Sequence, residues 1–224
     1  IMAISFSDEQ AMLLETATDF CQKRSPMQAV RGALDATEVN RELWAEMAGL
    51  GWLGISIPES FGGLGLGVDS LVPIVEAMGR QLMGTPYFGS VLATETLVRD
   101  GTEEQKAKWL PALANGSIAT LALSEEDGSW LLENVTVVAT NKEGTLTLNG
   151  RKCFVTDADI ADLLIVSVML EGNAVLALVQ RDQLSGSAIR RETVIDQTKR
   201  SFQVDFDGVE IPNNQVLDAA DFGH

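Results

Sequence analysis

The sequence has little cysteine and histidine, and each shortage excludes a class of protein. Its 224 residues include two cysteines, Cys21 and Cys153, which are too few and too far apart for a disulfide framework or a zinc-binding pattern. The one histidine is the last residue, His224, so a serine or cysteine nucleophile paired with a histidine base is not expected. No spacing of histidines, cysteines or carboxylates indicates a metal site, and we expect none.

Positive charge is also scarce. The chain has 16 lysines and arginines against 32 aspartates and glutamates, for a formal net charge of −16. A protein that binds nucleic acid needs a basic surface, and no basic run or stripe supplies one. The acidic balance repels an anionic ligand at long range, so a nucleotide or CoA site would depend on local basic residues or backbone N–H groups.

Long apolar runs are missing as well. No stretch is long enough to span a bilayer, and we expect no signal peptide. With two reduced thiols as the simplest interpretation of its cysteines, the chain is expected to be cytoplasmic. Hydrophobic residues make up 46% of it, which is enough to build the core of one or two domains.

The first half of the sequence is predicted to be helical. Ser7 with Gln10, and Thr102 with Gln105, match the capping box that begins a helix. Apolar residues at helical spacing predict further helices from about residue 40 to 50, from about 69 to 82 and from 90 to 99. In the first of these, Leu50 is expected to be buried, and in the second, Leu82 is expected to lie on the apolar face. The glycine-rich stretch at 61–67 fits neither the dinucleotide nor the P-loop spacing, so we interpret it as a tight loop between helices.

After Gly116 the period changes to that of strands. Alternating or continuous apolar residues predict strands at about 118–124, 135–139, 146–148, 163–168, 174–180, 188–195 and 203–206. Asn149-Gly150 is typical of a hairpin turn, because both residues accept a positive φ. A run of helices followed by a run of strands predicts an α+β chain of two domains, with the boundary near 116. Composition and spacing alone assign this protein no activity.

Five segments, in this order, resemble the acyl-CoA dehydrogenase family, and together they extend over nearly the whole chain. They are FSDEQ at 6–10, IPESFGGLG at 57–65, GTEEQK with WLP at 101–106 and 109–111, LNGRKCFVT at 148–156, and FDGVEIP at 206–212. The resemblance implies an N-terminal all-α helical domain over 1–116 and a middle β-barrel-like domain over 117–224. The family's C-terminal four-helix bundle, which usually carries the catalytic glutamate, is expected to be missing from this chain.

The same resemblance implies FAD as the cofactor and an acyl-CoA as the substrate. Family members remove a proton and a hydride from adjacent carbons of the acyl group, form a trans-enoyl-CoA, and pass electrons to an electron-transfer flavoprotein. Such enzymes belong to fatty acid and other lipid metabolism. They form homo- or hetero-oligomers, and we expect an oligomer here without a membrane span.

Residues that match the family's motifs supply the candidate site. The strand that lines the flavin ring corresponds to Leu121, Leu123 and Ser124. The aromatic residue beside the flavin and the threonine beside its reactive nitrogen correspond to Phe154 and Thr156. A family serine near the acyl-CoA corresponds to Ser129, which is the substrate-binding candidate. No catalytic base is assigned within the chain.

The chain also departs from the family's pattern. Glu126 stands where the family usually has proline, Ser124 replaces a threonine and Phe154 replaces a tryptophan. These changes leave two alternatives open. One is a non-catalytic or partner-dependent subunit of a hetero-oligomeric acyl-CoA dehydrogenase, and the other is an acyl-CoA oxidase or flavin monooxygenase of the same fold.

Overall fold

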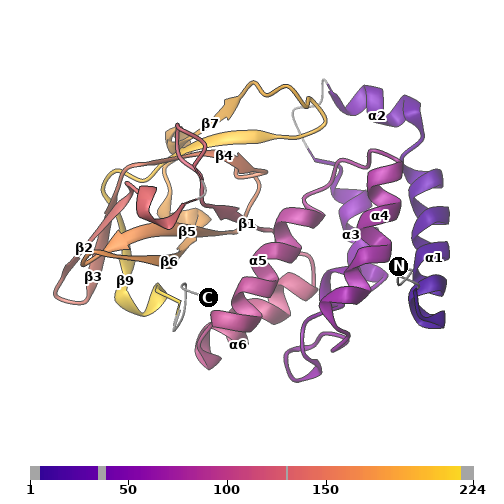
Figure 1. Cartoon of the computed structure of the whole chain (residues 1–224), viewed down its shortest axis with the longest axis horizontal. Helices are drawn as coiled ribbons and strands as arrows, with labels where there is room; N and C mark the ends of the chain where they lie inside the picture. Colours follow the sequence, from indigo (N-terminus) through magenta and orange to yellow (C-terminus); the bar gives the residue numbers. More distant parts are fainter. Residues whose placement is uncertain (1–5, 35–38, 130, 218–224) are drawn as a thin grey trace, which may run out of the picture.

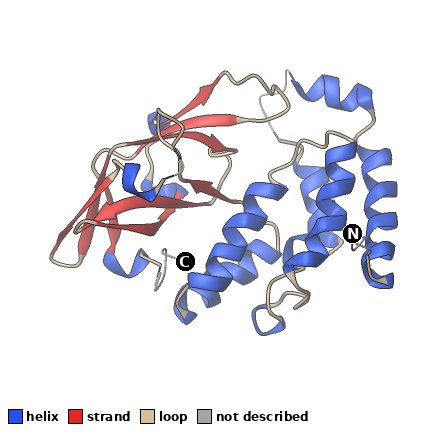
Figure 2. Cartoon of the chain, in the orientation of Figure 1, coloured by secondary structure: helices blue, strands red, loops and turns tan. Residues whose placement is uncertain are grey.

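A computed structural model describes residues 6–34, 39–129 and 131–217, and it places a group of helices beside a curled mixed β-sheet (Figure 1). The helices are α1 (Asp8–Arg24), α2 (Met27–Leu34), α3 (Arg41–Gly49), α4 (Val72–Arg80), α5 (Tyr87–Asp100) and α6 (Glu103–Ala114). The strands follow α6 without a further long helix in the described residues, and the sheet forms a half-barrel (Figure 2). This arrangement confirms the predicted fold class.

Local capping signals begin the helices as predicted. Ser7 and Gln10 form the capping box of α1, and Thr102 and Gln105 form that of α6. Asn40 caps α3 by accepting a hydrogen bond from the Leu43 amide. These contacts satisfy N–H groups that have no partner within the helix.

Three helical predictions were wrong, and one helix was missed. Leu50, expected to be buried, and Leu82, expected on the apolar face of its helix, are 45% and 48% exposed, because each lies just after its helix has ended. The helix α2 was not predicted, since it is only eight residues long and buries only Val30. The fourth helix begins at Val72 after a 3₁₀ turn, η3 (Val68–Leu71), rather than at residue 69.

The strands form two sheets. They are β1 (Ala119–Ala122), β2 (Val138–Lys142), β3 (Thr145–Asn149), β4 (Arg151–Thr156), β5 (Leu163–Leu170), β6 (Asn173–Gln180), β7 (Ile189–Glu192), β8 (Ser201–Asp205) and β9 (Val209–Pro212). The larger sheet has the order β1-β5-β2-β3-β9 with β6 on the other edge of β5, and the smaller has the order β4-β8-β7. In the larger sheet β1 and β2 pair in succession, both parallel, with the same edge of β5.

The predicted hairpin at Asn149-Gly150 was wrong. There the chain passes from β3 in the larger sheet to β4 in the smaller one, and these two strands do not pair with each other. Gly150 has a φ of +128°, and a Cβ atom there would lie 3.0 Å from the Cα of Val137. Tight turns do join β2 to β3 and β5 to β6, where Glu143-Gly144 and Glu171-Gly172 adopt positive φ.

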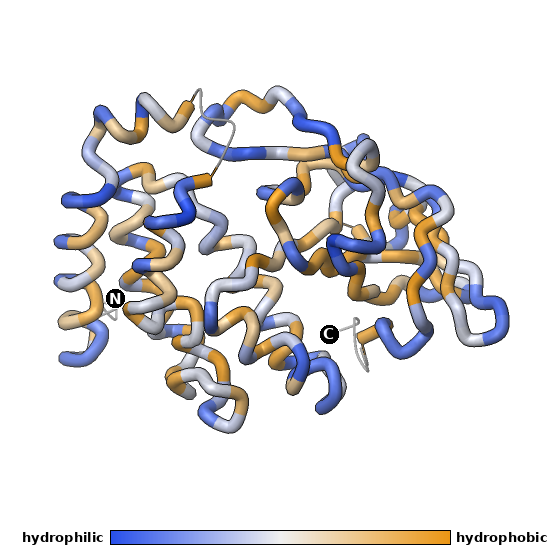
Figure 3. Tube along the Cα trace, turned by 180° about the vertical axis from the view of Figure 1, so that it is seen from behind, coloured by the Kyte–Doolittle hydropathy of each residue, from blue (hydrophilic) through white to orange (hydrophobic). Residues whose placement is uncertain are grey.

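A large apolar cluster joins the helices to the sheets. Trp44 and Met47 of α3 belong to the same buried cluster as Val137 and Val204 from the strand half. Figure 3 shows the hydropathy along the chain, with apolar segments in both the helices and the strands. The indole N–H of Trp44 donates to the carbonyl of Gly116, 2.7 Å away, between α6 and β1. The two halves therefore pack directly against each other near the segment where helices give way to strands. No helix of the described chain is long and apolar enough to cross a membrane.

Candidate functional site

The ends of β1 and β4 lie side by side and bring most of the predicted cofactor residues together. The amide of Cys153 donates to the carbonyl of Ser124 at 2.9 Å, and the hydroxyl of Thr120 donates to the carbonyl of Thr156 at 2.7 Å. These bonds join segments about 30 residues apart in the sequence, so the two family motifs form one continuous surface.

Side chains on this surface are exposed or lack protein partners. Leu123 is 40% exposed and Phe154 is 51% exposed, although both are apolar. Ser124 and Thr156 are half-buried, and neither hydroxyl has a hydrogen-bond partner among residues 6–34, 39–129 and 131–217. We call Leu121, Leu123, Ser124, Phe154 and Thr156 the strand-end face. An apolar surface with unpaired hydroxyls is suited to cover a planar ligand that carries hydrogen-bonding atoms at its edge.

A β-bulge in β4 determines which residues reach that face. The pairing of β4 with β8 shifts by one residue between Lys152 and Val155. In an unbroken strand Lys152, Phe154 and Thr156 would share one side, because side chains alternate. In this strand Lys152 is fully buried, whereas Phe154 faces solvent and adopts a φ of +58°. The bulge has therefore turned Phe154 and Thr156 away from the side that holds Lys152.

Behind the strand-end face lies a buried ion pair. The ammonium group of Lys152 donates to Glu125 Oε1 and to Ser167 Oγ, each at 2.8 Å, and to the carbonyl of Leu123 at 3.1 Å. Glu125 also accepts hydrogen bonds from the amide and hydroxyl of Thr136 and from the amide of Val137. The carbonyl of Leu123, a residue after β1, thus accepts a hydrogen bond from the side chain of Lys152 on β4.

The pKa values of the pair agree with that arrangement. Burial raises the pKa of Glu125, but hydrogen bonds from Lys152 and Thr136 outweigh it, so this pKa lies below its ordinary value of 4.5. Burial lowers the pKa of Lys152 from its ordinary 10.5, and the contact with Glu125 opposes that shift. The hydrogen bond between the two groups favours the charged form of each, against the cost of burial.

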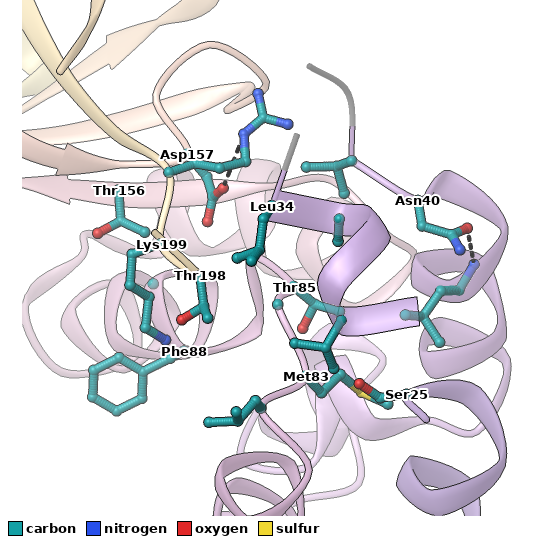
Figure 4. A pocket seen from close by; sticks show the side chains of 18 of the residues that line it. Ser25, Leu34, Asn40, Met83, Thr85, Phe88, Thr156, Asp157, Thr198 and Lys199 are labelled. Atoms are coloured by element: carbon teal, nitrogen blue, oxygen red, sulfur yellow. Dashed lines mark hydrogen bonds and ion pairs between the residues drawn. The ribbon is translucent and has the colours of Figure 1, made fainter. Parts of the chain in front are cut away.

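A cavity of about 610 Å³ adjoins the strand-end face, between the helices and the smaller sheet. Leu121 and Thr156 line it from the strands, and Phe88 and Leu92 line it from α5. Figure 4 shows Thr156 and Lys199 on one side and Met83 and Thr85 on the other. The volume falls in the range of small-molecule sites.

Charge at the cavity is mostly basic. Arg24, Arg191, Lys199 and Arg200 line it, and among the described residues 6–34, 39–129 and 131–217 the lining carboxylate is Asp157. Asp157 lies 3.8 Å from Arg200, measured from Oδ1 to Nε. Burial raises the pKa of Asp157 to about 6, and the charge of Arg200 acts in the opposite direction. The cavity thus has basic side chains in its wall, although Arg24 and Arg200 are ion-paired with carboxylates.

The other predictions fall outside the cavity. Leu123, Ser124 and Phe154 belong to the strand-end face but do not line the cavity, and neither does Ser129. Ser129 lies in the loop after β1, where its Oγ accepts hydrogen bonds from the Leu131 amide and from Asn134 Nδ2. His224 lies outside the described residues, within which no group of three histidines, cysteines or carboxylates could hold a metal ion.

Two residues of the site were missed by the sequence analysis. Lys152 is a lysine in a strand, which usually indicates an exposed position, and its burial follows from partners on other strands. Glu192 contacts the backbone of Phe154 from a segment 38 residues away. The sequence holds no local signal for either role.

Comparison with known proteins identifies both halves of the chain. Residues 7–117 match the model described as acyl-CoA dehydrogenase, N-terminal domain, and residues 120–208 match that of the middle domain. The acyl-CoA dehydrogenase FadE12 of Mycobacterium tuberculosis is 30% identical over 194 residues, which cover 82% of this chain and 50% of the relative. The mitochondrial isovaleryl-CoA dehydrogenase of Pongo abelii is 35% identical over 165 residues, covering 71% and 39%.

Solved structures share the fold. A structure described as a steroid ACAD superposes with a TM-score of 0.83 at 26% identity, covering 94% of this chain and 57% of the other. Butyryl-CoA dehydrogenase from Megasphaera elsdenii superposes with a TM-score of 0.82 at 24% identity, covering 96% and 60%. The chain spans about half the length of the curated relatives it matches.

Proposed function

The chain belongs to the acyl-CoA dehydrogenase family, and from this premise we propose that it supplies part of the flavin and acyl sites of an FAD-dependent enzyme. The reaction would convert an acyl-CoA to a trans-enoyl-CoA, with electrons passing to an electron-transfer flavoprotein. The observation that carries the proposal is the strand-end face. It has an exposed aromatic ring and two hydroxyls without a hydrogen-bond partner among the described residues, and it adjoins a cavity of about 610 Å³.

The residues of this face fit an isoalloxazine ring. Phe154 offers a ring that can cover one side of it, and the hydroxyls of Ser124 and Thr156 can donate hydrogen bonds to its polar edge. When bound there, FAD would accept the hydride removed from the acyl chain. Donors at the ring edge favour the extra electron density that this transfer brings.

The cavity is the candidate for the acyl group. Leu121, Phe88 and Leu92 give it apolar walls that exclude water, and Lys199 and Arg200 add positive charge on the strand side. Removal of the proton next to the thioester requires a base. Within the part of the chain that the structure describes, Asp157 is the carboxylate that lines the cavity, and it is already held in an ion pair with Arg200. We therefore propose that the base comes from a further segment or a partner chain.

A partner-dependent subunit is the second candidate. Phe88 is 57% exposed and Phe154 is 51% exposed, and exposed apolar surface of this kind can form part of a contact with another chain when it is contiguous. A structure that shares the fold, at a TM-score of 0.84 and 23% identity, is described as the ChsE4-ChsE5 complex from Mycobacterium tuberculosis. In this case flavin binding would require the second chain.

The first test is the visible absorption spectrum of the purified natural protein, before and after addition of a panel of acyl-CoAs without oxygen. We expect a flavin spectrum that one acyl-CoA bleaches. Phe154→Ala should weaken FAD binding, whereas Val138→Ala should not, because Val138 is similarly exposed but lies on β2. A protein that stays colourless with FAD, both alone and with candidate partner chains, would refute the proposal.

A further inference from the structure

The bulge in β4 creates a hydrogen-bonding problem that two contacts resolve. Cys153 and Phe154 together oppose one residue of β8, so their amides lose the regular ladder partners. The amide of Cys153 donates to the carbonyl of Ser124 at the end of β1. The amide of Phe154 donates to Glu192 Oε2 at 2.8 Å. A side chain thus replaces the strand carbonyl that the bulge has removed.

Glu192 is well placed to hold this amide. It is the last residue of β7 and pairs with Ser201 of β8, which lies between β7 and β4. The same oxygen, Oε2, also accepts the hydroxyl hydrogen bond of Ser201 at 2.8 Å. The carboxylate therefore joins all three strands of the smaller sheet at the point where β4 bulges.

The backbone of Phe154 needs such support. Its φ of +58° is a left-handed conformation that costs free energy for a residue with a side chain. If the strand relaxed to regular pairing, the alternation of side chains would return Phe154 and Thr156 to the side that holds Lys152. The strand-end face would then lose its aromatic ring and one of its hydroxyls.

We propose that Glu192 is a positioning residue, whose carboxylate holds the β4 bulge so that Phe154 and Thr156 face the flavin. The identity of the ligand in this inference, a flavin, rests on the proposed function. Its structural part, that Glu192 holds the bulge, stands on the two hydrogen bonds to Oε2.

Two variants and one control, made in the full-length natural protein, test whether Glu192 holds the β4 bulge. Glu192→Ala removes the acceptor, and Glu192→Gln keeps a carbonyl oxygen in nearly the same place. Glu210→Ala is the matched control, because Glu210 is an exposed glutamate on β9 whose side chain makes no hydrogen bond within the described residues. Thermal unfolding of each variant shows whether the fold is kept.

Amide hydrogen exchange at Phe154 measures whether Glu192 holds the bulge, and this measurement needs no ligand. We expect exchange at this amide to rise by about tenfold or more in Glu192→Ala, because its acceptor is gone. Glu192→Gln should restore most of the protection, and Glu210→Ala should leave it unchanged. Equal exchange in the wild type and in Glu192→Ala would overturn the inference.

The affinity for FAD measures whether holding the bulge positions Phe154 and Thr156 for the flavin. Loss of a hydrogen bond to a charged acceptor should raise the dissociation constant of FAD about tenfold in Glu192→Ala, with rescue to within about threefold in Glu192→Gln. A lower melting temperature with unchanged FAD affinity would show a merely structural role and refute positioning. If the wild type took up no FAD, the proposed function would fail, while the exchange measurement would still decide whether Glu192 holds the bulge.

Discussion

Replacement of Lys152 by methionine is the most direct perturbation of the support behind the strand-end face. The lysine side chain is fully buried, and its ammonium group makes hydrogen bonds to Glu125, Ser167 and the carbonyl of Leu123. Methionine has a similar length and fills most of the same space without a charge. The change therefore leaves the carboxylate of Glu125, whose side chain is 10% exposed, without its counter-ion.

The magnitude follows from the burial of the pair. Removal of one partner from a buried ion pair costs about 3–5 kcal/mol. We expect about 3 kcal/mol, at the lower end, because Glu125 keeps three hydrogen bonds from Thr136 and Val137. For a chain of this size that loss lowers the melting temperature by about 6–12 °C.

Urea unfolding at pH 7 measures the loss, with Lys142→Met as the control. Lys142 is an exposed lysine on β2, so its replacement should change the unfolding free energy by less than about 0.5 kcal/mol. Adding Glu125→Gln to Lys152→Met should recover part of the stability, since no buried charge then remains unpaired. A loss below about 1 kcal/mol in Lys152→Met would refute the buried-pair reasoning.

The pH dependence gives an independent check on the same pair. The pKa of Glu125 in the folded state lies below its ordinary value of 4.5, so its stabilising contribution is present above pH 4.5. That contribution is lost as the pH falls through the folded-state pKa. Without Lys152 the folded-state pKa rises, and acid unfolding of Lys152→Met should begin at a higher pH than in the wild type.

Three further predictions concern other parts of the chain. Burial raises the pKa of Asp157 from 3.8 to about 6, so the ionisation of this carboxyl opposes folding as the pH rises from 3.8 to about 6. Urea unfolding should therefore show that Asp157→Asn raises the unfolding free energy by about 2 kcal/mol at pH 8 and leaves it unchanged at pH 3. Gly150→Ala should cost about 2 kcal/mol or more in thermal unfolding, because its Cβ would meet Val137; Gly172→Ala, which meets nothing, should cost about 1 kcal/mol. Gln105→Leu should lose about 2 kcal/mol and speed amide exchange at 213–216, because Gln105 Nε2 binds two carbonyls there.

Local signals in the sequence predicted the helix starts well. The capping boxes at Ser7 and Thr102 depend on residues three positions apart, so the sequence contains the whole interaction. The helix α2 lacks such a signal and was missed. Leu50 and Leu82 have helical spacing but lie beyond the helix ends, so periodicity alone assigned them to the core.

Non-local pairing accounts for the errors among the strands. Asn149-Gly150 has the composition of a hairpin turn, yet the chain there changes sheets. What decides between the two outcomes is whether β3 finds β4 or β9 as its neighbour, and β9 begins 60 residues after Asn149. Turn composition reports which backbone angles are accessible, and not which strands will pair.

In the candidate site, too, local sequence signals were informative and contacts between distant segments were not predicted. The resemblance to a family pointed to Phe154 and Thr156, but strand alternation would place them on the side of Lys152. The bulge reverses that assignment, and its amides are satisfied by Ser124, just after β1, and by Glu192 of β7. Each partner is distant in the sequence, so no window around Phe154 contains the cause of its exposure. The geometry of the face is therefore a property of the assembled sheets, and substitutions at those distant partners should alter it as much as substitutions within the motif.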